Sequence, residues 1–190
     1  MNGRCGRGCR LAAALLTVAA CQAGPTRAVL HPPGAPGRPS GVLTWAASAE
    51  RMGAGVAGAQ YRMIVHTSVG GGAPRIRFTN AFGDRPLTLD HVYAGLRARG
   101  AALRPGGNHA LTFGGAHRIT VPADSVAWSD PLPGRVPAGA DLAVSLRTPR
   151  AGGPASGHEL ALQTSYTGLG GDLTAEDGGA HWARTTGAWW

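Results

Sequence analysis

The stretch QYRMIVHTSVGGGAPRIRFTNAFGDRPLTLDHV, residues 60–92, decides the fold class of this chain. Apolar and polar residues alternate through Tyr61–His66 and again through Arg75–Thr79, on either side of three glycines. Alternation with a period of two is typical of strands with one buried and one wet face, and a glycine turn between two such runs favours their pairing. Asn80–Pro86 then supplies residues typical of a turn. The stretch therefore predicts paired antiparallel strands.

Similar short runs, separated by turn residues, continue towards the C-terminus. Their spacing of about ten residues is typical of an antiparallel β-sandwich or barrel. We expect strands near residues 43–47, 60–67, 74–80, 86–93, 109–113, 117–121, 125–129, 140–147 and 159–166.

The alternation also predicts which side chains form the core. Leu142, Val144 and Leu146 should point to one side of their strand, and Leu160 and Leu162 should line the same core. Helix signals are weak, and residues 46–57 are the only short candidate. Residues 149–157 are rich in glycine and proline and are predicted to form a mobile loop.

The first 21 residues have the pattern of a secretory signal. A basic start is followed by the apolar run Leu11–Ala20 and then by Cys21. Val18–Cys21 resembles a bacterial lipobox, in which the thiol of Cys21 takes a lipid and becomes the mature N-terminus. The alternative is a plain secretory signal in which Cys21 is incidental. Either interpretation predicts an exported protein, which is extracellular in one case and lipid-anchored at the cell surface in the other. The lipid anchor would be its only contact with a membrane.

A Pro/Gly-rich spacer, residues 22–40, separates this leader from the predicted domain at residues 41–178, and residues 179–190 form a divergent tail. Cys5 and Cys9 are lost with the leader, so the folded domain should contain no disulfide.

The basic character of the chain does not indicate nucleic-acid binding. The net charge is +8, with eighteen basic and ten acidic residues. Removing Arg4, Arg7 and Arg10 with the leader leaves fifteen basic against ten acidic residues, a net charge of +5. The remaining arginines are dispersed along the chain, which is typical of solvated strand faces.

Seven sequence blocks follow one another in the predicted domain: LTWAAS (43–48), VHTS (65–68), RIRFTNAFGDRPLTLDHV (75–92), ALTFGG (110–115), ITVPADSVAWSDPL (119–132), DLAVSL (141–146) and LQTSYTGLGGDLTA (162–175). In this order they resemble the N-terminal accessory domain of secreted actinobacterial SGNH/GDSL-type ester hydrolases. The similarity covers roughly 130 residues, although no single block is a catalytic signature.

The resemblance implies a jelly-roll-like β-sandwich that precedes a flavodoxin-like catalytic domain. In that family the serine nucleophile lies in a Gly-Asp-Ser turn and works with a distal Asp-x-x-His. Here Leu173 follows Gly171-Asp172, and the spacing from Asp177 to His181 is one residue too long. We therefore expect no catalytic residue in this chain, and the chain alone should be inactive. We also expect it to be a truncated or split gene product. Its partner would be a missing or separately encoded catalytic domain.

Other candidate sites are weak. Ser129, Asp130 and His66 could form a triad only by assembly from distant strands, and Ser129-Asp130 before a proline is more simply a turn. His158-Glu159 begins like a zinc-protease motif, but Leu162 replaces the second ligand. We expect no metal and no cofactor.

Three tryptophans suggest a second function. Three side chains, Trp45, Trp128 and Trp182, could stack on sugar rings or contact another domain. The alternative for each of them is packing in the core. Trp189 and Trp190 would add an apolar patch at the end of the sequence. The alternative function is thus a stand-alone, exported, carbohydrate-binding surface lipoprotein.

Overall fold

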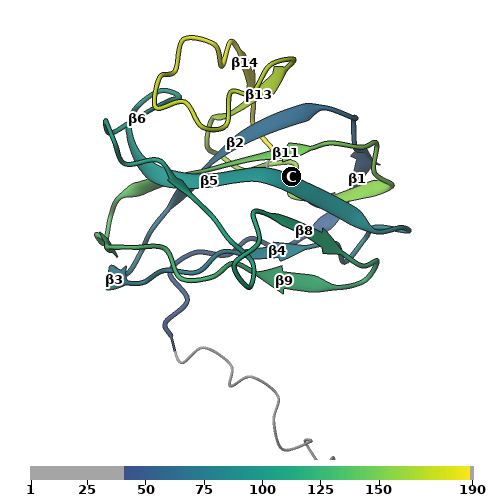
Figure 1. Cartoon of the computed structure of the whole chain (residues 1–190), viewed down its shortest axis with the longest axis horizontal. Coiled ribbons are helices and arrows are strands. Elements are labelled where there is room, and N and C mark those ends of the chain that lie inside the picture. The colour runs from purple at the N-terminus through teal and green to yellow at the C-terminus, as the bar shows by residue number, and fades with distance from the viewer. Residues whose placement is uncertain (1–40, 189–190) are drawn as a thin grey trace, which may run out of the picture. The chain divides into compact units, whose positions relative to one another are not determined.

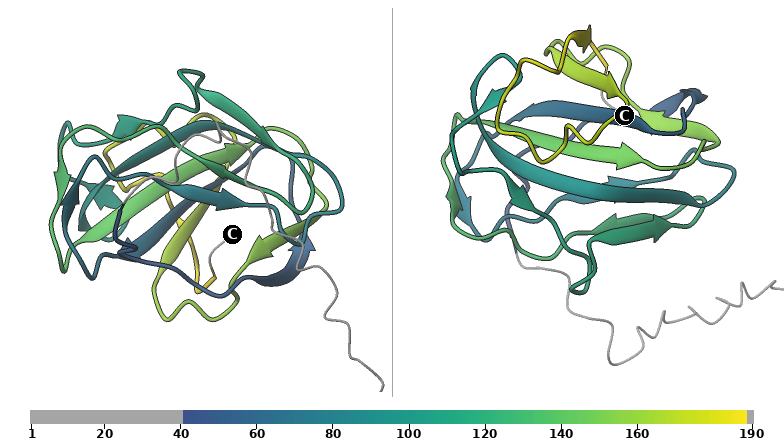
Figure 2. Two further views of the ribbon diagram at one scale, coloured as in Figure 1. Left: turned by 90° about the horizontal axis from the view of Figure 1, so that it is seen from below. Right: turned by 45° about the horizontal axis from the view of Figure 1, so that its top comes forward.

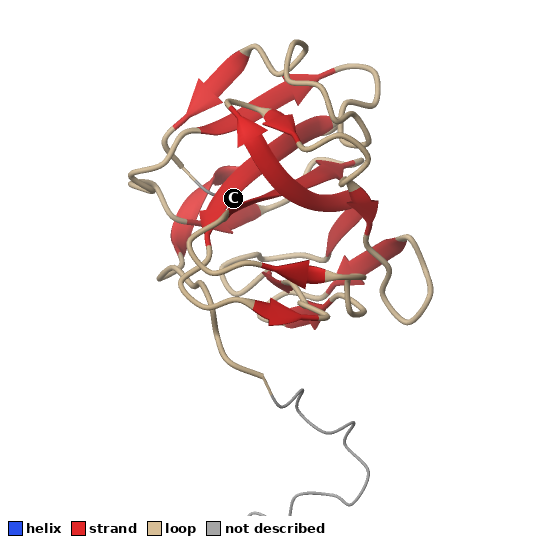
Figure 3. Cartoon of the chain, turned by 90° about the vertical axis from the view of Figure 1, so that its left-hand side faces the viewer, coloured by secondary structure: helices blue, strands red, loops and turns tan. Residues whose placement is uncertain are grey.

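The computed structural model of the protein describes residues 41–188. Within this range the chain forms fourteen strands and no helix (Figures 1 and 3). All strand pairs are antiparallel, so the predicted all-β, antiparallel sandwich class is confirmed. The leader, Cys21, the spacer, Trp189 and Trp190 lie outside the described residues.

The strands follow one another closely, and several contain only two or three residues. They are β1 Glu50–Ala54, β2 Ala59–His66, β3 Gly71–Gly72, β4 Arg77–Thr79, β5 Leu87–Arg99, β6 Ala102–Leu103, β7 His109–Ala110, β8 Arg118–Val121, β9 Val126–Trp128, β10 Arg135–Val136, β11 Asp141–Thr148, β12 Pro154–Gly157, β13 Ser165–Leu169 and β14 Arg184–Thr186.

One large sheet dominates the domain. Its strand order is β14-β13-β2-β11-β5-β6, and β7 and β8 also pair with β5. The shorter pairs β4–β9 and β3–β10 lie on one side of this sheet, below it in Figure 1, and β1 pairs with β12. The segment between β13 and β14 lies on the other side of the sheet (Figures 1 and 2).

The main core lies between the large sheet and the β4–β9 layer. Leu142, Val144 and Leu146 of β11 are buried in it, as predicted, together with Phe78 and Phe113. The two phenylalanine rings meet edge to face, with centroids 5.8 Å apart. Burial of these side chains is the main stabilising term of the sandwich.

The predicted wet face of β2 is in fact covered. Arg62 and Ile64, which point away from the main core, are fully buried, because residues 170–182 pack over the outer face of the sheet. Ile64 belongs to a second apolar cluster that includes Tyr166 and Trp182. Alternation of residue types correctly separates the two faces of a strand, but it does not reveal that a distant segment covers the polar one.

The predicted hairpin across Gly70–Gly72 is also wrong. β2 pairs with β11 and β13, whereas β4 pairs with β9 in the opposite layer. Two of the three glycines instead form β3, which pairs with β10. The chain therefore crosses from one layer to the other where the sequence suggested a tight turn.

Four further element predictions need correction. The helix candidate at residues 46–57 contains β1, and the predicted loop at 149–157 contains its partner β12. Residues 43–47 form no strand. The strand expected at 159–166 starts only at Ser165, and Leu160 and Leu162 are 70% and 89% exposed, so they do not line the core.

Candidate functional site

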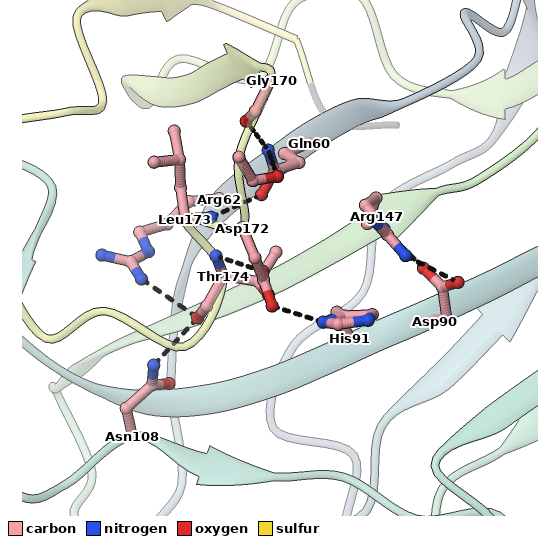
Figure 4. A network of polar contacts seen from close by, with 11 residues as sticks. Gln60, Arg62, Asp90, His91, Asn108, Arg147, Gly170, Asp172, Leu173 and Thr174 are labelled. Atoms are coloured by element: carbon pink, nitrogen blue, oxygen red, sulfur yellow. Dashed lines mark hydrogen bonds and ion pairs between the residues drawn. The ribbon is translucent and has the colours of Figure 1, made fainter.

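The outer face of the large sheet carries a network of polar contacts (Figure 4). Its buried part is centred on Arg62 of β2, whose guanidinium is fully buried. The five oxygens that accept its hydrogen bonds are Ser145 Oγ (2.8 Å) and the carbonyl oxygens of Ala101 (2.8 Å), Glu176 (2.6 Å), Gly178 (3.3 Å) and Thr174 (3.4 Å).

The chemistry of Arg62 suits this position. A guanidinium presents five N–H donors in a fixed plane, so one side chain can satisfy several carbonyls that would otherwise be buried without a partner. The cation also lies 4.6 Å from the ring centroid of Trp182, a favourable cation–π contact. Burial lowers the pKa of Arg62 to about 10, opposed by the nearby carboxylates of Glu176 and Asp177, so the side chain stays charged at neutral pH.

Two amide side chains complete this arrangement, which we call the Arg62 clamp. Gln60 donates to the carbonyl of Gly170 (2.7 Å) and accepts from the Leu173 N–H (2.7 Å). Asn108 donates to the carbonyl of Thr174 (2.9 Å). The clamp thus holds residues 170–178 against the sheet at several points, which fixes the segment leading towards β14.

A β-bulge in β5 creates the more exposed part of the network. The register between β5 and β11 shifts between Ser145 and Arg147, and His91 has a φ of 48°. Such a left-handed conformation is uncommon for a residue other than glycine. Because the bulge adds one residue to β5, both Asp90 and His91 reach the outer face.

Each side chain at the bulge has a charged partner. Arg147 makes two hydrogen bonds to the carboxylate of Asp90, at 2.9 and 3.1 Å, and these bonds raise the pKa of Arg147. His91 Nδ1 bonds the carboxylate of Asp172, which lies in the clamped segment. Burial tends to raise the pKa of Asp172, but hydrogen bonds from Thr174 and His91 outweigh it and hold that pKa below its ordinary value.

An open groove of about 440 Å³ lies at the bulge. We call it the β5 groove, and it is lined by Asp90–Tyr93, Ala110 and Ala116–Arg118. This lining supplies one carboxylate, two imidazoles, one guanidinium, one phenol and small apolar surfaces, without a serine or cysteine. The arrangement can therefore bind a polar ligand, whereas it holds no serine or thiol nucleophile for acyl transfer.

The predicted tryptophan sites do not come together. Trp45 packs against the main core, and Trp182 is 3% exposed beneath Arg62. Trp128 on β9 is 41% exposed, and Arg77 lies 5.9 Å from its ring centroid. Cys21 lies outside the described residues.

The hypothetical triad residues have separate structural partners. Ser129 is fully buried, and its hydroxyl accepts the Ile76 N–H. His66 bonds Asp141 at 2.9 Å. Asp130 accepts hydrogen bonds from the backbone N–H groups of Gly114 and Gly115 and from Thr112, and these bonds hold its pKa below the ordinary value.

Sequence reasoning missed the clamp and the groove. For the groove a signal existed: the apolar positions of β5 are Leu87 and Leu89 and then Val92, Ala94 and Leu96. The step of three between Leu89 and Val92 breaks the period of two and indicates an extra residue, which is where the bulge lies.

No family model matches the chain, and no match was found among curated proteins. Among residues 41–188 there is no cluster of three or more His, Cys, Asp or Glu side chains that could hold a metal ion. None of the described segments forms a helix of the length and apolarity needed to cross a bilayer.

Proposed function

We propose that the domain is a non-catalytic module of the kind that precedes the catalytic domain in SGNH/GDSL-type ester hydrolases, acting beside a hydrolase domain encoded downstream. The observation that carries this proposal is how the domain uses its reactive side chains. Arg62, Ser129 and Asp130 each bind backbone groups of the same chain. Side chains bound in this way hold loops in place, which is a structural use of these groups.

The clamped C-terminal segment also supports this role. Residues 170–178 are held on the sheet, and β14 pairs with β13 at its edge. A domain whose last strand is fixed in this way can orient a neighbouring domain that packs on it. Its contribution would be the placement of a hydrolase on an ester or acylated polysaccharide.

The leader extends the proposal to the compartment. Residues 1–21 support export, with Cys21 as the lipidation site and a freely secreted form as the alternative. Expression in an actinobacterial host with membrane fractionation separates the two forms. A lipidated protein stays with the membrane and is released by Cys21→Ser, whereas a freely secreted protein is in the medium with either residue.

Labelling with a fluorophosphonate tests the non-catalytic role, because this reagent reacts with activated serines. We expect the intact mass of the folded chain to stay unchanged, and hydrolysis of p-nitrophenyl acetate to equal that of the heat-unfolded chain. A stoichiometric adduct on one serine, with loss of hydrolysis in its Ser→Ala variant, would refute the proposal.

A second candidate function is carbohydrate binding by a stand-alone surface lipoprotein. The observation in its favour is Trp128, whose ring is 41% exposed on β9 beside the exposed Val126. An exposed aromatic ring can stack on the apolar face of a sugar. A Trp128→Ala variant that loses binding to soluble oligosaccharides would support this location, and a variant that binds them like the parent would exclude it.

A further inference from the structure

We propose that the β5 groove, and not the exposed tryptophan, is a carbohydrate-binding site that takes one sugar ring with neighbouring hydroxyls. This inference deepens the second candidate function and rests on it. It does not require a hydrolase domain, because every residue that it uses lies within residues 90–174.

The first argument is the hydrogen-bonding capacity that remains in the groove. A carboxylate accepts about four hydrogen bonds, so Asp90 keeps free acceptor sites after accepting two bonds from Arg147, which does not itself line the groove. His91 uses Nδ1 for Asp172 and keeps Nε2. Each sugar hydroxyl donates one hydrogen bond and accepts others, and adjacent donors and acceptors therefore match neighbouring hydroxyls.

The second argument is that these groups are held in place before a ligand arrives. Asp90 and His91 are fixed by the bulge, Arg147 by its two bonds to Asp90, and Asp172 by Thr174 and the Arg62 clamp. Figure 4 shows His91 turned towards Asp172, with the Asp90–Arg147 pair on the neighbouring strands. A preorganised site does not lose side-chain entropy on binding, which matters for weak sugar ligands.

The third argument concerns charge. Asp90 is the one carboxylate of the lining and is paired with Arg147 of β11, so the groove presents no unpaired carboxylate. Arg118 and His117, which also line the groove, allow sugars that carry a carboxylate as well as neutral ones.

Size and apolar surface agree with this ligand class. A volume of about 440 Å³ lies within the range of small-molecule sites. The methyl groups of Ala110 and Ala116 and the ring of Tyr93 offer apolar surface to the C–H groups of a sugar. The left-handed backbone of His91 is the kind of local strain that collects at ligand sites.

The test is an NMR titration of the full ¹⁵N-labelled chain with soluble cello-, xylo-, chito- and galacturono-oligosaccharides, up to about 10 mM. We expect at least one of them to shift the amides of residues 90–93 and 116–118. Asp90→Asn and His91→Asn should each weaken binding about tenfold, the loss expected for one polar contact. Asparagine tolerates the positive φ of residue 91, so His91→Asn should preserve the fold.

Trp128→Ala separates this groove from the exposed tryptophan as the site, and Arg150→Ala, at an exposed position outside the groove, is the matched control that should bind like the parent. The dispersion of each spectrum reports folding. Three results would overturn the inference. If no oligosaccharide shifts any amide, carbohydrate binding fails as a whole. If binding survives both groove variants or is lost in Trp128→Ala, the site lies elsewhere although the function stands. If inorganic phosphate shifts the same amides with comparable affinity, the groove is a simple anion site.

Discussion

Replacing Arg62 by methionine tests the clamp that organises the outer face of the sheet. Methionine has a similar length and fills much of the same space, but it carries neither charge nor donors. The substitution would remove all five hydrogen bonds of Arg62 and its contact with Trp182.

The expected magnitude follows from which oxygens remain buried. The bonds to Ser145 Oγ and the Ala101 carbonyl are buried, and each acceptor left unsatisfied there costs about 1–3 kcal/mol. The Thr174 carbonyl keeps its hydrogen bond from Asn108. Loss of the cation–π contact adds about 1 kcal/mol. Removing a buried charge returns part of its desolvation cost, so we expect a net loss of about 3 kcal/mol. For a domain of about 150 residues this lowers Tm by about 6–12 °C.

Thermal unfolding followed by circular dichroism measures the loss, and amide hydrogen exchange locates it. Exchange should accelerate first at residues 170–178, including the Leu173 N–H that Gln60 accepts. Arg99→Met, at the exposed end of β5, is the matched control and should change stability by less than about 0.5 kcal/mol. A Tm change below about 2 °C in Arg62→Met, or unchanged exchange at residues 170–178, would refute the reasoning.

Three further substitutions give distinct outcomes. Gly95→Ala should destabilise by about 1–3 kcal/mol in urea unfolding, since a Cβ there would lie 2.7 Å from the Gly107 carbonyl oxygen; an unchanged urea midpoint would contradict this close approach. Leu162→Gly should stabilise by about 0.5–1 kcal/mol, because Leu162 is exposed with a φ of 52°, and a loss of stability would show that this strain is absent. Hydrogen bonds led by the Gly115 N–H hold the pKa of Asp130 below 3.8 in the folded state, so the stability that ionised Asp130 contributes is present above that value and is lost as pH falls through the lower folded-state pKa. The free energy of unfolding of Asp130→Asn should therefore fall less steeply than that of the parent between about pH 5 and pH 2, and an unchanged acid profile would refute the assignment.

The sequence predicted the strands well where burial alone determines them. Leu142, Val144 and Leu146 lie in the core as expected, since alternation reports directly which face of a strand is apolar. The same alternation made Arg62 look exposed. Its burial depends on residues 170–182, more than a hundred positions away, and no local pattern reports such a contact.

Strand pairing and the groove show the same limit. The glycines after β2 suggested a hairpin, but β2 pairs with β11, because a hydrophobic pattern specifies a face and not a partner. The break in the apolar period at Asp90 and His91 does mark the bulge. It could not predict that Arg147 and Asp172 would meet those two residues, since they come from another strand and a loop.

The central claim, an accessory module of an SGNH/GDSL-type hydrolase, is tested most directly by sequencing the locus through the codon for Trp190 and several hundred bases beyond, with translation of the three forward frames. The proposal predicts a Gly-Asp-Ser block followed later by Asp-x-x-His in one of these frames, because in SGNH/GDSL-type hydrolases the catalytic domain carries the serine nucleophile and its base in these two motifs. Unrelated sequence in all three frames would contradict the account.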